Sequence, residues 1–128
     1  MRWLLDTNVL IDAFAGRPDA ARAMAAARSA NLEWVGFSAL TRLETLGFAS
    51  LTPADDRGLR ELLAQFNEAQ ITPDIIEEAI RVRKAIRIKT PDALIAATAL
   101  NHQATLVTRN VADFRRVPGL KVLDSATF

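Results

Sequence analysis

Short apolar segments alternate with longer helix-forming segments along the chain, and this alternation restricts the fold more than any other feature of the sequence. The apolar segments cover residues 3–5, 33–37, 69–71, 105–108 and 120–123. The first of them, Trp3-Leu4-Leu5, consists only of large apolar side chains, which is typical of a strand buried on both faces of a parallel sheet. Strands that alternate with helices predict an α/β domain in which helices flank a central parallel sheet.

The expected helices have clear starting signals. Thr7 or Asn8 can cap the first helix and Ser38 the third, because these side chains accept a hydrogen bond from a free backbone amide. In the last three helices a threonine cap is followed by proline at the first helical position, and an aspartate lies in the first turn. Beyond the first, the helices are expected over residues 20–30, 39–49, 53–66, 73–86 and 91–101. The remaining segments are a turn over 16–19, a basic connector over 86–89 and a loop or single helical turn over 109–114.

Composition limits the classes of protein to which the chain can belong. Its 128 residues, 50% of them apolar and 24% charged, predict one globular domain over residues 1–128. The absence of cysteine excludes disulfides, thiolate metal sites and cysteine nucleophiles. Because His102 is the only histidine, a two-histidine metal motif is excluded as well. No segment resembles a signal peptide or a membrane span, so we expect a soluble, cytoplasmic protein without a membrane partner.

Charge is distributed unevenly along the chain. Residues 1–80 carry seven basic and twelve acidic side chains, whereas residues 81–121 carry nine basic and only two acidic ones. A solvated helix face followed by a basic loop would explain this excess. A surface that binds phosphate groups would explain it equally well, and the sequence leaves both interpretations open.

Four acidic side chains occur where strands and helices are expected to meet. Asp6 directly follows the first strand, Asp113 follows the strand over 105–108, Asp92 lies in the first turn of its helix, and Glu44 lies within another helix. Strand ends and the helix starts after them share one edge of an open parallel sheet. Carboxylates brought together there repel one another unless a cation compensates them, although each acid alone is explained as a cap or an ion-pair partner.

A cation at such a cluster would have only oxygen ligands. Mg²⁺ and Mn²⁺ favour that set. These ions can hold a phosphate, activate a water and stabilise the leaving oxygen of a phosphodiester. The acids are therefore compatible with phosphodiester chemistry at this edge of the sheet, without requiring it.

The combination of these segments resembles the PIN-domain ribonucleases, and within them the VapC-type toxins of bacterial VapBC toxin–antitoxin pairs. The resemblance rests on Leu5-Asp6-Thr7-Asn8 within residues 4–12, Leu43-Glu44 within 38–44, Pro91-Asp92-Ala93 within 90–99, and Val107-Thr108-Arg109-Asn110 with Asp113 within 105–114. The order and spacing of these four blocks match across essentially the whole chain. The resemblance implies a PIN-like α/β/α domain and a Mg²⁺- or Mn²⁺-dependent endoribonuclease.

Positions carried over from the family assign roles to individual residues. Asp6, Glu44, Asp92 and Asp113 would be catalytic, and all of these except Glu44 would hold the metal. Asn110 stands where family members often have an acid directly after the strand, which leaves the number of metals open. The residues expected to orient the acids or the substrate are Thr7, Asn8, Thr108 and Asn110.

The resemblance also implies partners. RNA is the expected substrate, and candidates for contacts with its backbone lie in the basic run over 81–89, chiefly Arg87 and Lys89, and at Arg109. A homodimer is expected, as is a small antitoxin whose C-terminal segment lies along an apolar groove. The candidate groove residues are among Val9, Leu10, Phe14, Leu43, Leu46 and Phe48, although burial in the core better explains most of these side chains.

Two other functions are compatible with parts of the pattern. The missing acid at Asn110 would suit a PIN-like domain that binds RNA without cutting it. A phosphoacceptor receiver domain also places acids at strand ends, but it would need a second acid beside Asp6 and a lysine late in the chain. Asp6 has no such neighbour, and Lys121 lies in or next to the last expected strand.

Overall fold

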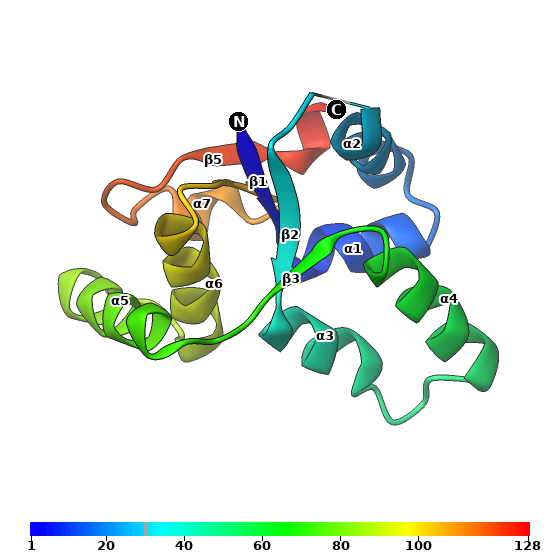
Figure 1. The fold of residues 1–128 in the computed structure, drawn as a ribbon, viewed down its shortest axis with the longest axis horizontal. Helices are drawn as coiled ribbons and strands as arrows, with labels where there is room; N and C mark the ends of the chain where they lie inside the picture. The colour runs from blue at the N-terminus through cyan, green and yellow to red at the C-terminus, as the bar shows by residue number, and fades with distance from the viewer. Residues whose placement is uncertain (30) are drawn as a thin grey trace.

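The centre of the molecule is a five-stranded sheet in which every pair of neighbouring strands is parallel (Figure 1). The computed structural model describes residues 1–29 and 31–128. The strands are β1 (Arg2–Leu5), β2 (Trp34–Ser38), β3 (Asn67–Ala69), β4 (Thr105–Thr108) and β5 (Val122–Asp124). Their order is β3-β2-β1-β4-β5. The direction of strand succession therefore reverses between β1 and β4, which is where open α/β sheets form a ligand-binding crevice.

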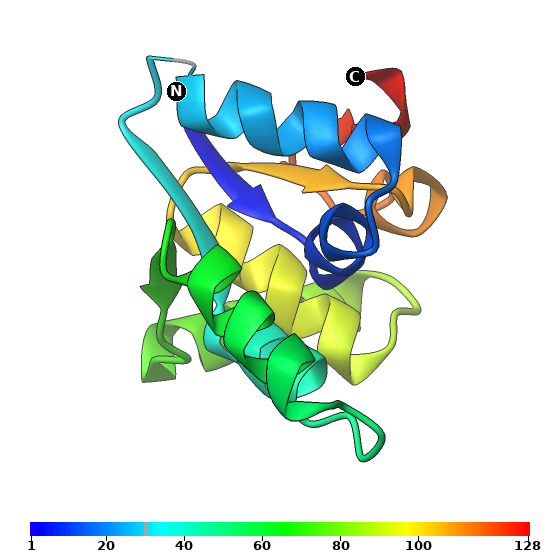
Figure 2. The ribbon, with the colours of Figure 1, turned by 90° about the vertical axis from the view of Figure 1, so that its right-hand side faces the viewer.

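Helices cover both faces of this sheet. In chain order they are α1 (Thr7–Phe14), α2 (Pro18–Ser29), α3 (Ala39–Leu46), α4 (Pro53–Leu63), α5 (Pro73–Ala85), α6 (Thr90–Asn101) and α7 (Val111–Phe114), followed by a 3-10 turn, η1 (Ser125–Thr127). Figure 1 shows α5 and α6 on one side of the sheet and α1, α2 and α4 on the other. In the turned view of Figure 2, α4 lies in front of the sheet and α6 behind it.

Alternating side chains of the central strands supply the two halves of the core. Leu4 packs with Leu106, Phe114 and the apolar sides of α5 and α6. Trp3 and Leu5 point to the opposite face and pack with residues of α1, α2 and α4. Since both faces of β1 are buried, the strand is apolar throughout, as its sequence predicts. The predicted α/β architecture with a central parallel sheet is confirmed.

Two helix starts differ from the prediction. The first helix is capped by Asp6, whose side chain accepts the amide of Thr7, and neither Thr7 nor Asn8 is the cap. The sixth helix already includes Thr90, because the carbonyl of Lys89 accepts the amide of Ala93 and no side chain caps this end. By contrast, Ser38 caps α3 as predicted.

Several other boundaries shift by a few residues. The second helix begins at Pro18, since proline suits a first helical position, and the predicted end at Ala30 lies outside the described residues. The third helix ends at Leu46 instead of residue 49. Strand β3 lies two residues earlier than predicted because the Asn67 side chain donates to the Val35 carbonyl and fixes the register with β2. The smaller shifts are α4 ending at Leu63, α5 at Ala85, and β5 covering Val122–Asp124.

None of the helices within residues 1–29 and 31–128 is both long and apolar enough to cross a membrane.

Candidate active site

Asp6 lies at the carboxyl end of the central strand, at the point where the strand order reverses. Its backbone amide donates to the carbonyl of Val107 at 2.9 Å, which continues the pairing of β1 with β4. Its side chain is only 6% exposed and accepts three hydrogen bonds. The Thr7 amide donates to Oδ1 at 2.8 Å, while the Thr108 hydroxyl and the Asn8 amide group donate to Oδ2 at 2.8 and 3.2 Å. The carboxylate is thereby fixed in one orientation.

The environment of Asp6 shows that other acids are close. Burial raises the pKa of Asp6 from 3.8 to about 6, because removal from water disfavours the charged form. The hydrogen bonds from Thr108 and the Thr7 amide lower the pKa, but the negative charges of Asp92 and Glu44 raise it further. Asp6 at the start of α1, Glu44 of α3 and Asp92 of α6 therefore interact electrostatically at this edge of the sheet.

Asp92 is the second acid whose proton affinity is changed by folding. It lies half-buried in the first turn of α6. Burial raises its pKa, and the charges of Asp113 and Glu44 act in the same direction, whereas the Lys89 ammonium lowers it. All four predicted acids thus interact at one site, although they are separated by up to 107 positions in the sequence.

Glu44 is held by a short chain of hydroxyl groups. The Thr7 hydroxyl donates to Oε1 of Glu44 at 2.8 Å and lies 2.9 Å from the Thr41 hydroxyl. Because the Thr7 hydroxyl has a single proton, the Thr41 hydroxyl must be the donor in the second bond. Thr41 is fully buried and was not predicted as a site residue; its one signal in the sequence is its position one helical turn before Glu44.

The segment after β4 adds the fourth acid. The Asn110 side chain donates to Oδ2 of Asp113 at 2.8 Å, and the Asn110 amide donates to the Thr108 hydroxyl at 2.9 Å. The Thr108 hydroxyl therefore accepts from this loop and donates to Asp6. Asn110, at the position where an acid was expected, supplies a hydrogen-bond donor to Asp113 instead of a further negative charge.

The carboxylate oxygens at this site suit a hard divalent cation that keeps some of its water ligands. Within the described residues, no three acidic or histidine side chains stand close enough together to enclose a metal ion. Mg²⁺ does not require such a cage, since it commonly binds one or two carboxylates and keeps several waters. Burial is the main cause of the raised pKa values of Asp6 and Asp92, and the neighbouring acids add to it, so a cation would relieve repulsion already present in the folded chain.

The predicted RNA-contact residues fall into two groups. Arg87 and Lys89 line a cavity of about 440 Å³ together with Asp92 and Asp113. Arg109 lies elsewhere: its guanidinium donates to Asp12 at 2.7 Å, and its backbone amide donates to the Asn8 side chain at 3.3 Å. In the structure Arg109 joins the loop after β4 to α1, and a contact with RNA remains a prediction.

An open apolar depression adjoins the acids on the side of Glu44. It is lined by Thr7, Ile11, Leu43, Glu44, Gly47, Phe48, Ala49 and Ser50. Leu43 and Phe48 are 69% and 63% exposed, so they belong to the surface, as the predicted groove requires. Val9 and Leu10 are fully buried in the core because they face the sheet, so of the two interpretations the core one holds for them and they do not line a groove.

The other two predicted groove residues do not line this depression. Leu46 packs half-buried against the core. Phe14 is 39% exposed, and its ring lies so close to Gly58 of α4 that a side chain at position 58 would meet it at 2.7 Å. Ile11 lines the depression but was not predicted to do so.

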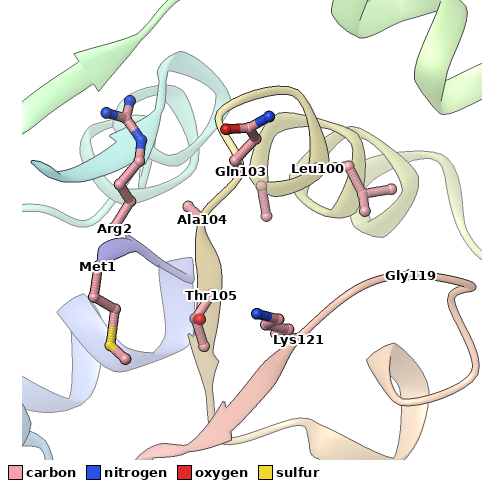
Figure 3. A pocket seen from close by; sticks show the side chains of 9 residues that line it. Met1, Arg2, Leu100, Gln103, Ala104, Thr105, Gly119 and Lys121 are labelled. Atoms are coloured by element: carbon pink, nitrogen blue, oxygen red, sulfur yellow. The ribbon is translucent and has the colours of Figure 1, made fainter.

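Another hollow lies at the opposite edge of the sheet. Figure 3 shows Met1 and Arg2 at the start of β1 and Thr105 at the start of β4, with Gln103 and Lys121 beside them. These are the amino ends of the strands, whereas Asp6 and Thr108 are at the carboxyl ends. This hollow is therefore separate from the acidic cluster, which consists of Asp6, Glu44, Asp92 and Asp113.

A cluster of carboxylates at the point where the order of a parallel sheet reverses defines a class of α/β domains suited to phosphodiester chemistry at a cation. The family model of the PIN domain matches residues 3–120. The chain belongs to the PIN domain family. A phosphoacceptor receiver domain, the more distant of the two alternatives, is not supported by this membership.

Individual relatives agree with the family. Ribonuclease VapC1 of Rickettsia felis is 54% identical over 41 residues, which are 32% of this chain and 31% of that protein. Ribonuclease VapC of Rickettsia bellii is 41% identical over 58 residues, 45% of this chain and 42% of that protein. The matched segments thus span less than half of either relative. A toxin–antitoxin complex from Klebsiella pneumoniae contains a chain of similar structure, with a TM-score of 0.81, 35% identity, and coverage of 95% of this chain and 96% of that one.

Proposed function

We propose that this PIN domain is a metal-dependent endoribonuclease that acts in the cytoplasm as the toxin of a type II, VapBC-like toxin–antitoxin system. The observation that carries the proposal is the buried carboxylate of Asp6, which hydrogen bonds hold in one orientation at the point where the strand order reverses. The names of the Rickettsia relatives and the Klebsiella complex, with its structural similarity over nearly the full length, support this function.

Some side chains at the site would bind the cation, and others orient the carboxylates that bind it. Asp6, Asp92 and Asp113 would hold Mg²⁺ or Mn²⁺, directly or through its water ligands, and the bound ion would supply a Lewis acid for phosphodiester hydrolysis. Thr108 and Asn8 hold Asp6 in position through their hydrogen bonds to Oδ2.

Two further contacts order the rim of the site. The buried Thr41 contacts Thr7, and Thr7 in turn holds Glu44 beside the other acids. In that position the Glu44 carboxylate can accept a proton from a water. Asn110 orients Asp113 through its amide group. The acids are therefore positioned before substrate arrives, which reduces the reorganisation needed during reaction.

Cleavage of RNA tests this proposal against the alternative of an RNA-binding domain without activity. We expect the purified chain to cut RNA in the presence of Mn²⁺ or Mg²⁺, and we expect EDTA to abolish cleavage because the carboxylates alone cannot compensate the charge of a phosphodiester. Excess Mn²⁺ should restore it. The same preparation of an Asp6→Asn variant controls for contaminating nucleases. Binding of RNA without cleavage under all these conditions would favour the inactive alternative suggested by Asn110.

The apolar depression beside Glu44 fits the expected small protein partner. Leu43 and Phe48 expose large apolar surfaces directly beside an acid of the site. A partner segment lying there would cover apolar surface and end near the carboxylates, where a basic side chain would compensate their charge.

We also propose that the chain forms a homodimer, which sedimentation of the purified protein would establish.

Substitutions in the depression test the partner assignment. When the chain is expressed with its neighbouring gene, a small protein is expected to co-purify in stoichiometric amount. Leu43→Asp with Phe48→Asp should weaken this association by at least about 100-fold, since two apolar side chains lose their burial. The control, Leu43→Met with Phe48→Leu, keeps the surface apolar and should retain the partner. Equal retention by both double variants would place the partner elsewhere.

A further inference from the structure

A basic cavity opens on the side of the acids away from the apolar depression. Arg83 of α5, Arg87 and Lys89 of the connector, and Arg116 after α7 surround it. Asp92 and Asp113, which belong to the acidic cluster, also line the cavity. The cavity is thus continuous with the proposed site of cleavage, and its volume of about 440 Å³ lies within the usual range of ligand sites.

The cations that line this cavity are not neutralised by a direct ion pair. In the described part of the chain, Arg83, Arg87, Lys89 and Arg116 form no ion pair. Five other arginines each contact an acid within 4.0 Å, namely Arg17, Arg42, Arg60, Arg81 and Arg109. Four unpaired cations around one hollow repel each other and attract an anion.

The wall of the cavity is held in place by the protein itself. The Arg116 guanidinium donates to the carbonyl of Arg87 at 2.9 Å and thereby joins the segment after α7 to the connector. Ile88, whose side chain is 8% exposed, fixes the connector in the core and contributes an apolar part of the lining. A preformed wall of this kind lowers the cost of ordering cationic side chains around a ligand.

We propose that this cavity is the subsite for a backbone phosphate of single-stranded RNA next to the phosphate that is cut. The inference rests on the proposed function, since it takes RNA as the substrate of the acidic cluster. The cations lie beside Asp92 and Asp113, so a strand with one phosphate at the acids has its next phosphates within reach of the cavity. The described lining residues include no aromatic side chain for base stacking, and recognition therefore concerns the backbone and not the bases.

This arrangement separates the two macromolecules that approach the acids. RNA enters along Arg83, Arg87 and Arg116, whereas the partner segment lies on Leu43 and Phe48, beyond Glu44. The two surfaces share only the acidic cluster. A partner at the depression would therefore compete with the cut phosphate and leave the basic subsite accessible.

Binding measured without cleavage tests the subsite. A fluorescent single-stranded RNA of about 12 nucleotides is titrated with the full chain in EDTA, and anisotropy reports binding. Arg83→Gln with Arg116→Gln should weaken binding on the order of tenfold at about 50 mM salt and reduce the slope of log affinity against log salt by roughly 1.4. Arg57→Gln with Arg115→Gln is the matched control. It removes the same charge from exposed arginines outside the cavity, and it should change binding less than about threefold.

Each outcome of this titration decides the proposal. Equal loss of RNA affinity in the two double variants would overturn the proposal, because only the overall charge would then matter. An absence of RNA binding by the wild-type chain would also overturn it. Thermal unfolding of Arg116→Lys, which keeps the charge, shows whether loss of the bond to Arg87 alone affects the fold; this variant should bind within about threefold of the wild type. Failure to cleave RNA with Mn²⁺, together with the expected binding differences, would contradict the nuclease function and leave the subsite intact.

Discussion

Asparagine at position 6 or at position 92 is expected to slow RNA cleavage by at least about 100-fold while the domain stays folded, since loss of a residue that merely supports a metal ligand costs about 10–100-fold. Each substitution removes a negative charge from the site and leaves the shape of the side chain nearly unchanged. Asparagine caps helices as well as aspartate does, so the bond from the Thr7 amide should persist in the Asp6→Asn variant. Initial rates of cleavage and thermal unfolding curves measure the two parts of the prediction.

Asp74→Asn provides a control from the same sequence context. Asp74 follows Thr72-Pro73 in the first turn of α5, as Asp92 follows Thr90-Pro91 at the start of α6, but it is exposed and lies outside the acidic cluster. Its substitution should leave the rate within about twofold, an effect of well under 1 kcal/mol on the barrier. Full activity of a folded Asp6→Asn protein would contradict the assignment of Asp6.

The stability of the metal-free protein should depend on pH in a way that Asp6 determines. Folding raises the pKa of Asp6 from 3.8 to about 6, so the folded state binds this proton more tightly than the unfolded state does. The resulting stabilisation is fully present below pH 3.8 and is lost as the pH rises through about 6. It amounts to about 3 kcal/mol in the free energy of unfolding. The raised pKa of Asp92 acts in the same direction.

Denaturant titrations in EDTA at several pH values, on the wild type and on Asp6→Asn, isolate this contribution. Other carboxylates titrate in both proteins, so the difference between their free energies of unfolding reports Asp6. Relative to the wild type, the variant should gain stability on going from about pH 4.5 to about pH 7.5, by about 2 kcal/mol. Saturating Mg²⁺ at the higher pH should stabilise the wild type by about 2–3 kcal/mol at 100 times its dissociation constant and stabilise the variant much less. Parallel pH profiles would exclude Asp6 as the buried acid with a raised pKa.

Local patterns in the sequence were sufficient to predict the architecture. The uninterrupted apolar run of β1 indicated burial on both faces, and Thr52 and Thr72 cap their helices as expected. Thr90 follows the same pattern but lies inside its helix, because the backbone of Lys89 already starts the hydrogen-bond ladder. A cap motif thus identifies the existence of a helix more securely than its first residue.

The site was predictable only in part because its interactions are long-range. Strand order places Asp6, Asp92 and Asp113 at one edge, and no local pattern shows that Asp6 is buried or that Thr41 supports Glu44 through Thr7. The basic run over 81–89 was visible in the sequence. Arg116 joins it through a bond to the Arg87 carbonyl across 29 positions, and nothing in the composition indicates that pairing. Arg109, a candidate for contact with RNA, is paired with Asp12 across 97 positions, and no local pattern indicates that pairing.

The hydroxyl of Thr108 connects residues from opposite ends of the chain. It donates to Asp6, 102 positions earlier, and accepts the amide of Asn110. While the protein is being synthesised, a nascent chain that ends before β4 contains Asp6 but lacks the strand that pairs with β1, the hydroxyl that orients the carboxylate and the acid at position 113. The acidic cluster consequently cannot assemble until β4 and the segment after it have been made.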